Sequence, residues 1–201
     1  MMQLEHIVDQ RDIQRRGGRC AKYPTSCLIH DMLERLLRKQ GLRPEDLVVL
    51  DTTYGEGRFY GAWRPYRLIA CDIRRWEWVV RPDVFVRAPS WSCWRKLGLE
   101  SVDLVVVDPP WMEKPGNGTR EPYMLRYAFG SPETIILGAI TTAEMLQAKH
   151  VLVHYTRYIL RPGWRIAGAV KYVYVSRYLK NQDLDSSPNH TLFYILEKVM
   201  G

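Results

Sequence analysis

Residues 47–61 read LVVLDTTYGEGRFYG, in which four apolar residues are followed by an aspartate and a glycine-rich turn. An apolar run this short that ends in Asp51 is typical of a strand buried on both faces of a parallel sheet. Gly55, Gly57 and Gly61 would then let the backbone bend sharply and a ligand approach it closely. Taken alone, the turn fits an ordinary connection between a strand and a helix equally well.

Three further apolar runs resemble the first, and each ends in a polar residue or a turn. They cover residues 68–72, 84–87 and 104–108. The segments between the runs leave room for crossover elements, which favours an α/β layered domain with a mostly parallel sheet. Only nine residues separate Gly57 from Arg67, so the first crossover helix must be short.

The rest of the chain is expected to supply helices, a last strand and an N-terminal arm. Apolar residues recur at three- and four-residue spacing after Thr25, which predicts an amphipathic helix that ends at Gly41. We predict another helix over residues 132–149 and a strand over 191–199, and leave residues 150–175 open between strand and helix. The basic residues 1–19 are expected to form an arm, and residues 20–201 a single catalytic domain.

Composition excludes several classes of protein. The 201 residues contain no apolar run near the ~20 residues that span a bilayer, and no secretory signal opens the chain, so a cytoplasmic protein is expected. The formal charge of +7 and the many tryptophans and tyrosines point to a polyanion with flat bases. Four cysteines form no CxxC pair and are expected to be buried thiols. The few asparagines and glutamines are typical of a thermophile.

The tetrapeptide Asp108-Pro109-Pro110-Trp111 directly follows the hydrophobic strand predicted over residues 103–107. Ligands bind at the carboxyl ends of strands in open α/β sheets, so this turn is placed for function. The prolines make the turn rigid and leave carbonyl oxygens as acceptors. An exocyclic amine could donate one hydrogen to the Asp108 carboxylate and one to the Pro109 carbonyl while Trp111 stacks on its ring. The alternative is a proline turn with an anchoring tryptophan.

Asp72 ends the second run, fifteen residues after Gly57. An acidic residue at this point can accept both hydroxyls of a ribose, which indicates an adenosine-containing ligand and leaves NAD possible. ATP hydrolysis is disfavoured because the chain has no GxxxxGK[ST] loop.

Together, Asp51, Gly55, Gly57, Asp72 and the DPPW tetrapeptide resemble the class I S-adenosylmethionine-dependent amino-methyltransferases, which methylate adenine N6, cytosine N4 and related amines. The resemblance runs from Lys22 to the end of the chain. The segment Lys22-Tyr23-Pro24-Thr25 is similar to a further cofactor motif of that family, and its position ahead of the glycine loop matches the motif order of the γ group. The implied fold is a Rossmann-like single domain with a central sheet flanked by helices.

The resemblance also implies which residues do what. The catalytic residues would be Asp108, Pro109, Pro110 and Trp111, with no metal. S-adenosylmethionine would be bound by Lys22, Tyr23, Pro24, Thr25, Asp51, Thr53, Gly55, Gly57, Asp72, Ile73 and Ala88. Many relatives also carry an aspartate after the third strand for the cofactor adenine, whereas this chain reads Arg87-Ala88-Pro89-Ser90.

The implied substrate is DNA or RNA. Arg120, Tyr123, Arg126 and Tyr127 lie in the segment after the tetrapeptide and could bind phosphates and stack on bases, although this loop could equally pack on its own body. Related sequence-specific DNA enzymes add a separate target-recognition domain, whereas 201 residues leave little beyond a catalytic core. Specificity would then come from short loops, a partner chain or homodimer, or RNA structure.

Further basic residues could add phosphate contacts: Arg64, Arg67, Arg74, Arg75, Arg157, Arg161, Arg165, Lys171, Arg177 and Lys180. The aromatic residues Trp76, Trp78 and Tyr158 lie among them in the sequence. The histidines at 30, 150, 154 and 190 have no metal-ligand spacing and are expected to be structural. Two other functions stay open: methylation of a protein glutamine amide, and a non-catalytic nucleic-acid-binding subunit.

Overall fold

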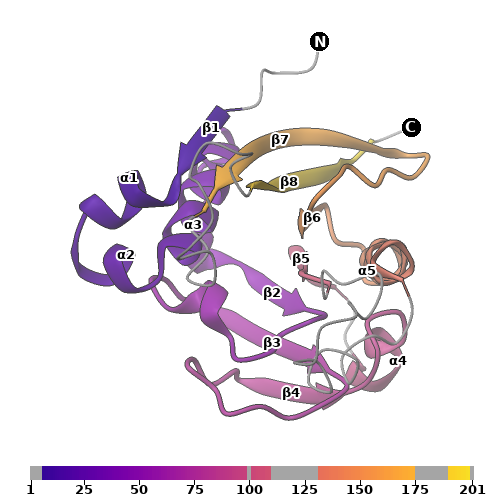
Figure 1. Ribbon diagram of the computed structural model, residues 1–201. Coiled ribbons are helices and arrows are strands. Elements are labelled where there is room, and N and C mark those ends of the chain that lie inside the picture. The colour runs from indigo at the N-terminus through magenta and orange to yellow at the C-terminus, as the bar shows by residue number, and fades with distance from the viewer. Residues whose placement is uncertain (1–5, 99–100, 110–130, 175–189, 200–201) are drawn as a thin grey trace, which may run out of the picture.

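A computed structural model describes residues 6–98, 101–109, 131–174 and 190–199 of the chain. In this part, eight strands form one sheet in the order β1-β7-β8-β6-β5-β2-β3-β4 (Figure 1). The strands are β1 His6–Asp9, β2 Val48–Asp51, β3 Arg67–Asp72, β4 Val84–Arg87, β5 Leu104–Val107, β6 His150–Tyr155, β7 Trp164–Val173 and β8 His190–Lys198. The α-helices are α1 Gln10–Arg15, α2 Gly18–Lys22, α3 Pro24–Leu37, α4 Cys93–Leu97 and α5 Pro132–Met145. Short 3₁₀ turns are η1 Arg38–Gln40, η2 Pro44–Asp46 and η3 Arg58–Tyr60.

The sheet is mostly parallel, as predicted. Strands β4, β3, β2, β5 and β6 pair parallel to their neighbours, and β8 inserts antiparallel between β6 and β7. Strand β2 therefore lies between β3 and β5, so the carboxyl ends of these three strands meet at one edge of the sheet.

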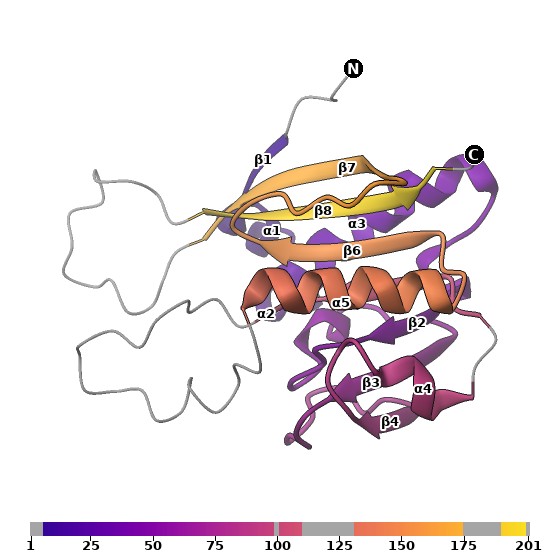
Figure 2. The same ribbon diagram turned by 90° about the vertical axis from the view of Figure 1, so that its right-hand side faces the viewer.

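Helices cover both faces of the sheet. In Figure 2, α4 and α5 lie on the side of the viewer and α3 lies behind the sheet. Alternate residues of β5 point to opposite layers: Val105 and Val107 pack with α5, whereas Leu104 and Val106 pack with the α3 side. All four are at most 1% exposed, which explains why the strand is apolar without interruption.

The predicted elements are mostly confirmed. Helix α3 begins with Pro24 in its first turn and buries one apolar face, while α5 ends at Met145, four residues before the predicted end. The first crossover is the single 3₁₀ turn η3, and residues 150–175, left open by the sequence, contain β6 and β7. The final strand, β8, was predicted within one residue at each end.

The N-terminal segment belongs to the sheet. Strand β1 pairs parallel with β7, and α1 buries Ile13 in the same core as α3. Residues 6–19, which composition set apart as an arm, are therefore ordered on the edge of the domain. No helix within the described ranges is long and apolar enough to cross a membrane.

The expectation of four free thiols is wrong. Cys20 is bonded to Cys27 and Cys71 to Cys93, with Cα–Cα distances of 5.6 and 6.2 Å. The first bond joins α2 to the first turn of α3, and the second joins β3 to the start of α4. The second pair is 22 residues apart in sequence, and only the packing of α4 against the sheet brings it together.

Candidate active site

Three carboxylates converge at the carboxyl edge of the sheet. Asp51 and Asp72 end β2 and β3, and Asp108 directly follows β5. The charges of Asp108 and Asp72 both contribute to raising the pKa of Asp51. Such a concentration of negative charge favours a cationic ligand.

Asp51 lies beneath the glycine loop rather than on the surface. It is 3% exposed, and its two oxygens accept hydrogen bonds from the Thr53 backbone N–H and the Tyr60 hydroxyl, each at 3.0 Å. Burial is the largest cause that raises the pKa of Asp51, to about 7. Its direct role is therefore to shape the loop. Tyr60 was not singled out by the sequence, because its contact depends on the turn at η3.

The glycine loop gives its glycines different tasks. Gly55 has φ +54° and donates its N–H to Asp72 Oδ2 at 2.9 Å. A Cβ placed at Gly55 would meet nothing nearer than the Thr53 carbonyl oxygen at 3.9 Å, so the space beside this glycine is open. At Gly57, with φ +75°, a Cβ would lie 2.4 Å from the Tyr54 hydroxyl oxygen. The expected close approach of a ligand thus fits Gly55, whereas Gly57 makes room for Tyr54.

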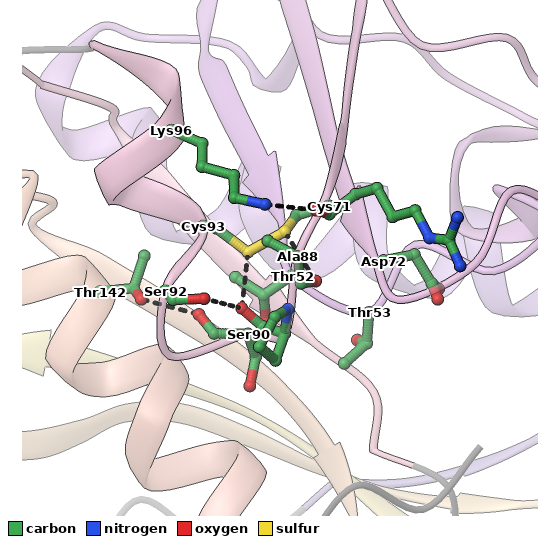
Figure 3. The surroundings of a disulfide bond; sticks show 12 residues. Thr52, Thr53, Cys71, Asp72, Ala88, Ser90, Ser92, Cys93, Lys96 and Thr142 are labelled. Atoms are coloured by element: carbon green, nitrogen blue, oxygen red, sulfur yellow. Dashed lines mark hydrogen bonds between the residues drawn. A yellow bond between two sulfur atoms is a disulfide. The ribbon is translucent and has the colours of Figure 1, made fainter. Parts of the chain in front are cut away.

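The carboxylate of Asp72 is fixed by backbone groups. It accepts hydrogen bonds from the N–H of Gly55 at 2.9 Å and of Arg74 at 3.0 Å. The backbone carbonyl of Asp72 accepts a hydrogen bond from the N–H of Ala88 at 3.1 Å, which joins the ends of β3 and β4. The Cys71–Cys93 disulfide adjoins these groups, as Figure 3 shows. Ile73 follows Asp72, and its carbonyl accepts a hydrogen bond from Arg87 at 3.1 Å.

The predicted cofactor segment before α3 contacts the end of the glycine loop. A Cβ at Gly61 would lie 2.4 Å from the ring of Tyr23, so that ring packs directly on this glycine. Lys22 lies over the same ring, with its Nζ 5.2 Å from the ring centroid, and Pro24 and Thr25 open α3. The structure therefore brings together two motifs that are thirty residues apart.

Asp108 is held from two sides. Its backbone N–H donates to Thr53 Oγ1 at 2.6 Å, which joins the end of β5 to the glycine loop. Its Oδ1 lies 3.0 Å from His154 Nδ1. Pro109 is buried, while Pro110, Trp111, Arg120, Tyr123, Arg126 and Tyr127 lie outside the described residues.

His154 is the residue that the sequence analysis underrated. It lies on β6, beside the end of β5, and its Nε2 is 3.0 Å from the Thr191 hydroxyl oxygen. The imidazole stacks on Phe193 with ring centroids 3.9 Å apart and an angle of 8° between the ring planes. A polar residue near the end of the apolar run VLVHY was the signal available, as it was for Asp108.

Several basic residues expected at nucleic acid pair with carboxylates of the same chain. Arg64 pairs with Asp83 at 2.6 Å, and the other pairs are Arg157 with Glu133, Arg161 with Glu144 and Arg165 with Glu197. Arg74 and Arg75 instead lie over the rings of Trp76 and Trp78, at 5.9 and 4.9 Å. The positive charge in the loop after β3 thus lies over aromatic rings, whereas Arg64, Arg157, Arg161 and Arg165 have acidic partners.

No protein-family profile matches the sequence, and no curated protein matches it. Solved structures do resemble it. The protein yhhF of Escherichia coli, provisionally described as a methyltransferase, is 11% identical over 86% of each chain, with a TM-score of 0.50. A protein of Streptococcus thermophilus provisionally described as a hemolysin is 12% identical over 83% of this chain and 64% of its own, with a TM-score of 0.51.

A Pyrococcus horikoshii protein provisionally described as an RNA methyltransferase is 17% identical over 86% of this chain and 84% of its own, with a TM-score of 0.46. Identities this low show the fold alone. The likeness to the Escherichia coli and Streptococcus thermophilus structures confirms the predicted Rossmann-like α/β fold.

Proposed function

We propose that the protein transfers a methyl group from S-adenosylmethionine to an exocyclic amino group of a nucleic-acid base. The observation that carries this proposal is Asp108, placed at the carboxyl end of β5, tied to the glycine loop through Thr53 and followed by a buried Pro109. Adenine N6 or cytosine N4 of DNA is the favoured target because of the motif order. RNA is the alternative, because an RNA can offer an unpaired base in a loop or single strand.

The residues at the edge of the sheet fit the cofactor. S-adenosylmethionine, when bound, supplies an electrophilic methyl group on a positively charged sulfur. The carboxylates of Asp72 and Asp108 provide negative charge beside such a ligand, and the open space beside Gly55 admits it to the backbone. Asp72, held by the N–H groups of Gly55 and Arg74, is positioned to accept ribose hydroxyls.

Asp108 and Pro109 would activate the substrate amine. An aromatic amine is a poor nucleophile because its lone pair is delocalised into the ring. Hydrogen bonds from its two hydrogens to the Asp108 carboxylate and the Pro109 carbonyl draw the nitrogen toward tetrahedral geometry and free that pair. Holding both reactants in line can lower the barrier by up to ~7–11 kcal/mol.

A base must leave its stack to reach Asp108, so a loop or single strand is a cheaper substrate than a duplex. The charge of +7 supports binding to a polyanion. A cytoplasmic location and a thermophilic source are part of the same proposal. Disulfides are rare in cytosolic proteins, and the proteins of hyperthermophiles are the exception. A partner protein or a homodimer would supply target specificity.

Methyl transfer to a protein glutamine amide fits less well, because the related motif is usually Asn-Pro-Pro-Tyr and this chain carries Asp and Trp. A non-catalytic subunit fits less well because Asp51, Gly55, Asp72 and Asp108 are all present and brought to one edge. Calorimetry with S-adenosylmethionine distinguishes a non-catalytic subunit from an enzyme, since a degenerate subunit should not bind the cofactor.

The test is transfer of labelled methyl to DNA, tRNA and rRNA, followed by nucleoside analysis. We expect Asp108→Ala, which removes the acceptor oxygens, to abolish transfer while cofactor binding by calorimetry survives. Asp103→Ala is the matched control, because Asp103 precedes the same strand at the opposite edge, where it accepts a hydrogen bond from the Val48 N–H. Full activity of Asp108→Ala would refute the assignment, and equal losses in both variants would indicate a general loss of structure.

A further inference from the structure

His154 and Asp108 are brought side by side by the pairing of β5 with β6. The strands are parallel, and Val107 of β5 is in register with Val153 of β6. The next residue of each strand is then Asp108 or His154, and both turn to the face opposite the two valines. On that face, His154 contacts Phe193 and Phe59, which belong to the core on the α3 side.

The imidazole is held in one orientation by contacts on every side. Nδ1 is 3.0 Å from Asp108 Oδ1 and Nε2 is 3.0 Å from Thr191 Oγ1. Phe193 stacks on the ring, and Phe59 meets it edge-on, with ring centroids 5.8 Å apart. The side chain of His154 is 13% exposed and Thr191 is fully buried. Rotating the imidazole would therefore break two hydrogen bonds and a stacked pair.

The partners also select a tautomer. An ionised carboxylate only accepts hydrogen bonds, so Nδ1 carries the hydrogen that faces Asp108. Nε2 of the neutral ring is then an acceptor, and the Thr191 hydroxyl donates to it. A carboxylate held through Oδ1 by His154 and through its own backbone N–H by Thr53 keeps one direction.

We infer that His154 is a positioning residue for methyl transfer: it donates from Nδ1 to Asp108 and fixes the carboxylate that receives the substrate amine. This inference rests on the proposed function. In the transfer, the amine lone pair forms the bond to the methyl carbon, the carbon–sulfur electron pair stays on sulfur, and the surplus amine proton leaves to the Asp108 carboxylate and then to water. His154 acts only through Asp108 and does not touch the reacting atoms.

The first test is activity. A hydrogen bond to a charged group contributes about 1.5–3 kcal/mol, which corresponds to about 10- to 100-fold in rate. We expect His154→Phe, which keeps the stacked ring, to lower kcat by about 10- to 100-fold while the KM for nucleic acid and the Kd for the cofactor stay within about twofold. His154→Asn, whose amide nitrogen can replace Nδ1, should recover most of the lost kcat. His150→Phe is the control, since His150 lies at the opposite end of the same strand.

The second test needs no turnover. Long-range ¹H–¹⁵N spectra of ¹⁵N-histidine-labelled protein should show Nδ1 protonated and Nε2 unprotonated, with His154→Asn identifying the signal. A protonated Nε2 with an unprotonated Nδ1 would overturn the inference. So would a wild-type kcat in His154→Phe, or a fall in kcat in His154→Asn as large as the fall in His154→Phe. If the wild type transfers no methyl to any nucleic acid, the proposed function fails and the positioning role fails with it; an active wild type isolates the role of His154.

Discussion

Removing the Cys71–Cys93 disulfide should destabilise the domain by an amount set by the loop it closes. The bond joins residues 22 apart, for which the loss of chain entropy in the unfolded state predicts about 3 kcal/mol at 25 °C. The Cys20–Cys27 bond closes a loop of only seven residues and should contribute about 2 kcal/mol. In a domain of this size, 3 kcal/mol corresponds to a fall in Tm of about 6–12 °C.

The structure offers a clean substitution. Each sulfur of the pair lies 3.3 Å from a carbonyl oxygen, that of Ala88 for Cys71 and that of Pro89 for Cys93 (Figure 3). A disulfide sulfur has no hydrogen to donate, but a serine hydroxyl at the same place does. The double variant Cys71→Ser/Cys93→Ser therefore leaves no buried hydroxyl unsatisfied, and the measured loss reports mainly the missing cross-link.

The assay is urea unfolding of the wild type and of both double serine variants, together with scanning calorimetry. Alkylation without reductant first checks that no cysteine reacts in the wild type. The two pairs share no contact, so the loss on full reduction of the wild type should approach the sum of the two variants. A loss below about 1 kcal/mol for Cys71→Ser/Cys93→Ser, or a larger loss for the shorter loop, would refute the entropic reasoning.

Two further predictions concern the site. Gly57→Ala should lower the free energy of unfolding clearly more than Gly98→Ala. Both glycines have positive φ, so each alanine costs about 1–2 kcal/mol, but only an alanine at 57 would also collide with Tyr54. Equal urea midpoints for the two variants would contradict this. The free energy of unfolding should fall as pH rises from about 4 to about 7, because folded Asp51 keeps its proton to about 7 whereas the unfolded chain releases it near pH 4. Asp51→Asn should remove this part of the slope, and an unchanged slope would show that Asp51 is ionised throughout.

Local pattern was enough to predict the strands that carry the site. The runs that end in Asp51, Asp72 and Asp108 are buried on both faces, so their apolar character is continuous and their last residues mark the functional edge. Glycine spacing predicted the turn after β2, and nine connecting residues correctly limited the first crossover to a short element. These features are encoded within single segments, which is why sequence alone discloses them.

The features that were missed all join segments that are distant in the chain. His154 meets Asp108 across 46 residues, and Cys71 meets Cys93 across the whole of β4 and the following turn. The sequence near His154 does not predict that β6 lies beside β5, because the order of strands is a property of the assembled sheet. The other partner of His154, Thr191, comes from β8, the antiparallel insertion, and is 37 residues away in the chain.

The site and the disulfide beside it are linked energetically. Three carboxylates at one edge repel each other, and burial of Asp51 adds a desolvation cost, so the arrangement that suits a cationic ligand opposes folding. The Cys71–Cys93 bond joins β3, which ends in Asp72, to the start of α4. It lowers the entropy of the unfolded chain and so stabilises the fold in the region where the carboxylates repel each other. A cationic ligand would offset the same repulsion, because its positive charge would lie beside these carboxylates. The cross-link and the ligand therefore stabilise one region by independent means, and loss of the first makes the domain depend more on the second.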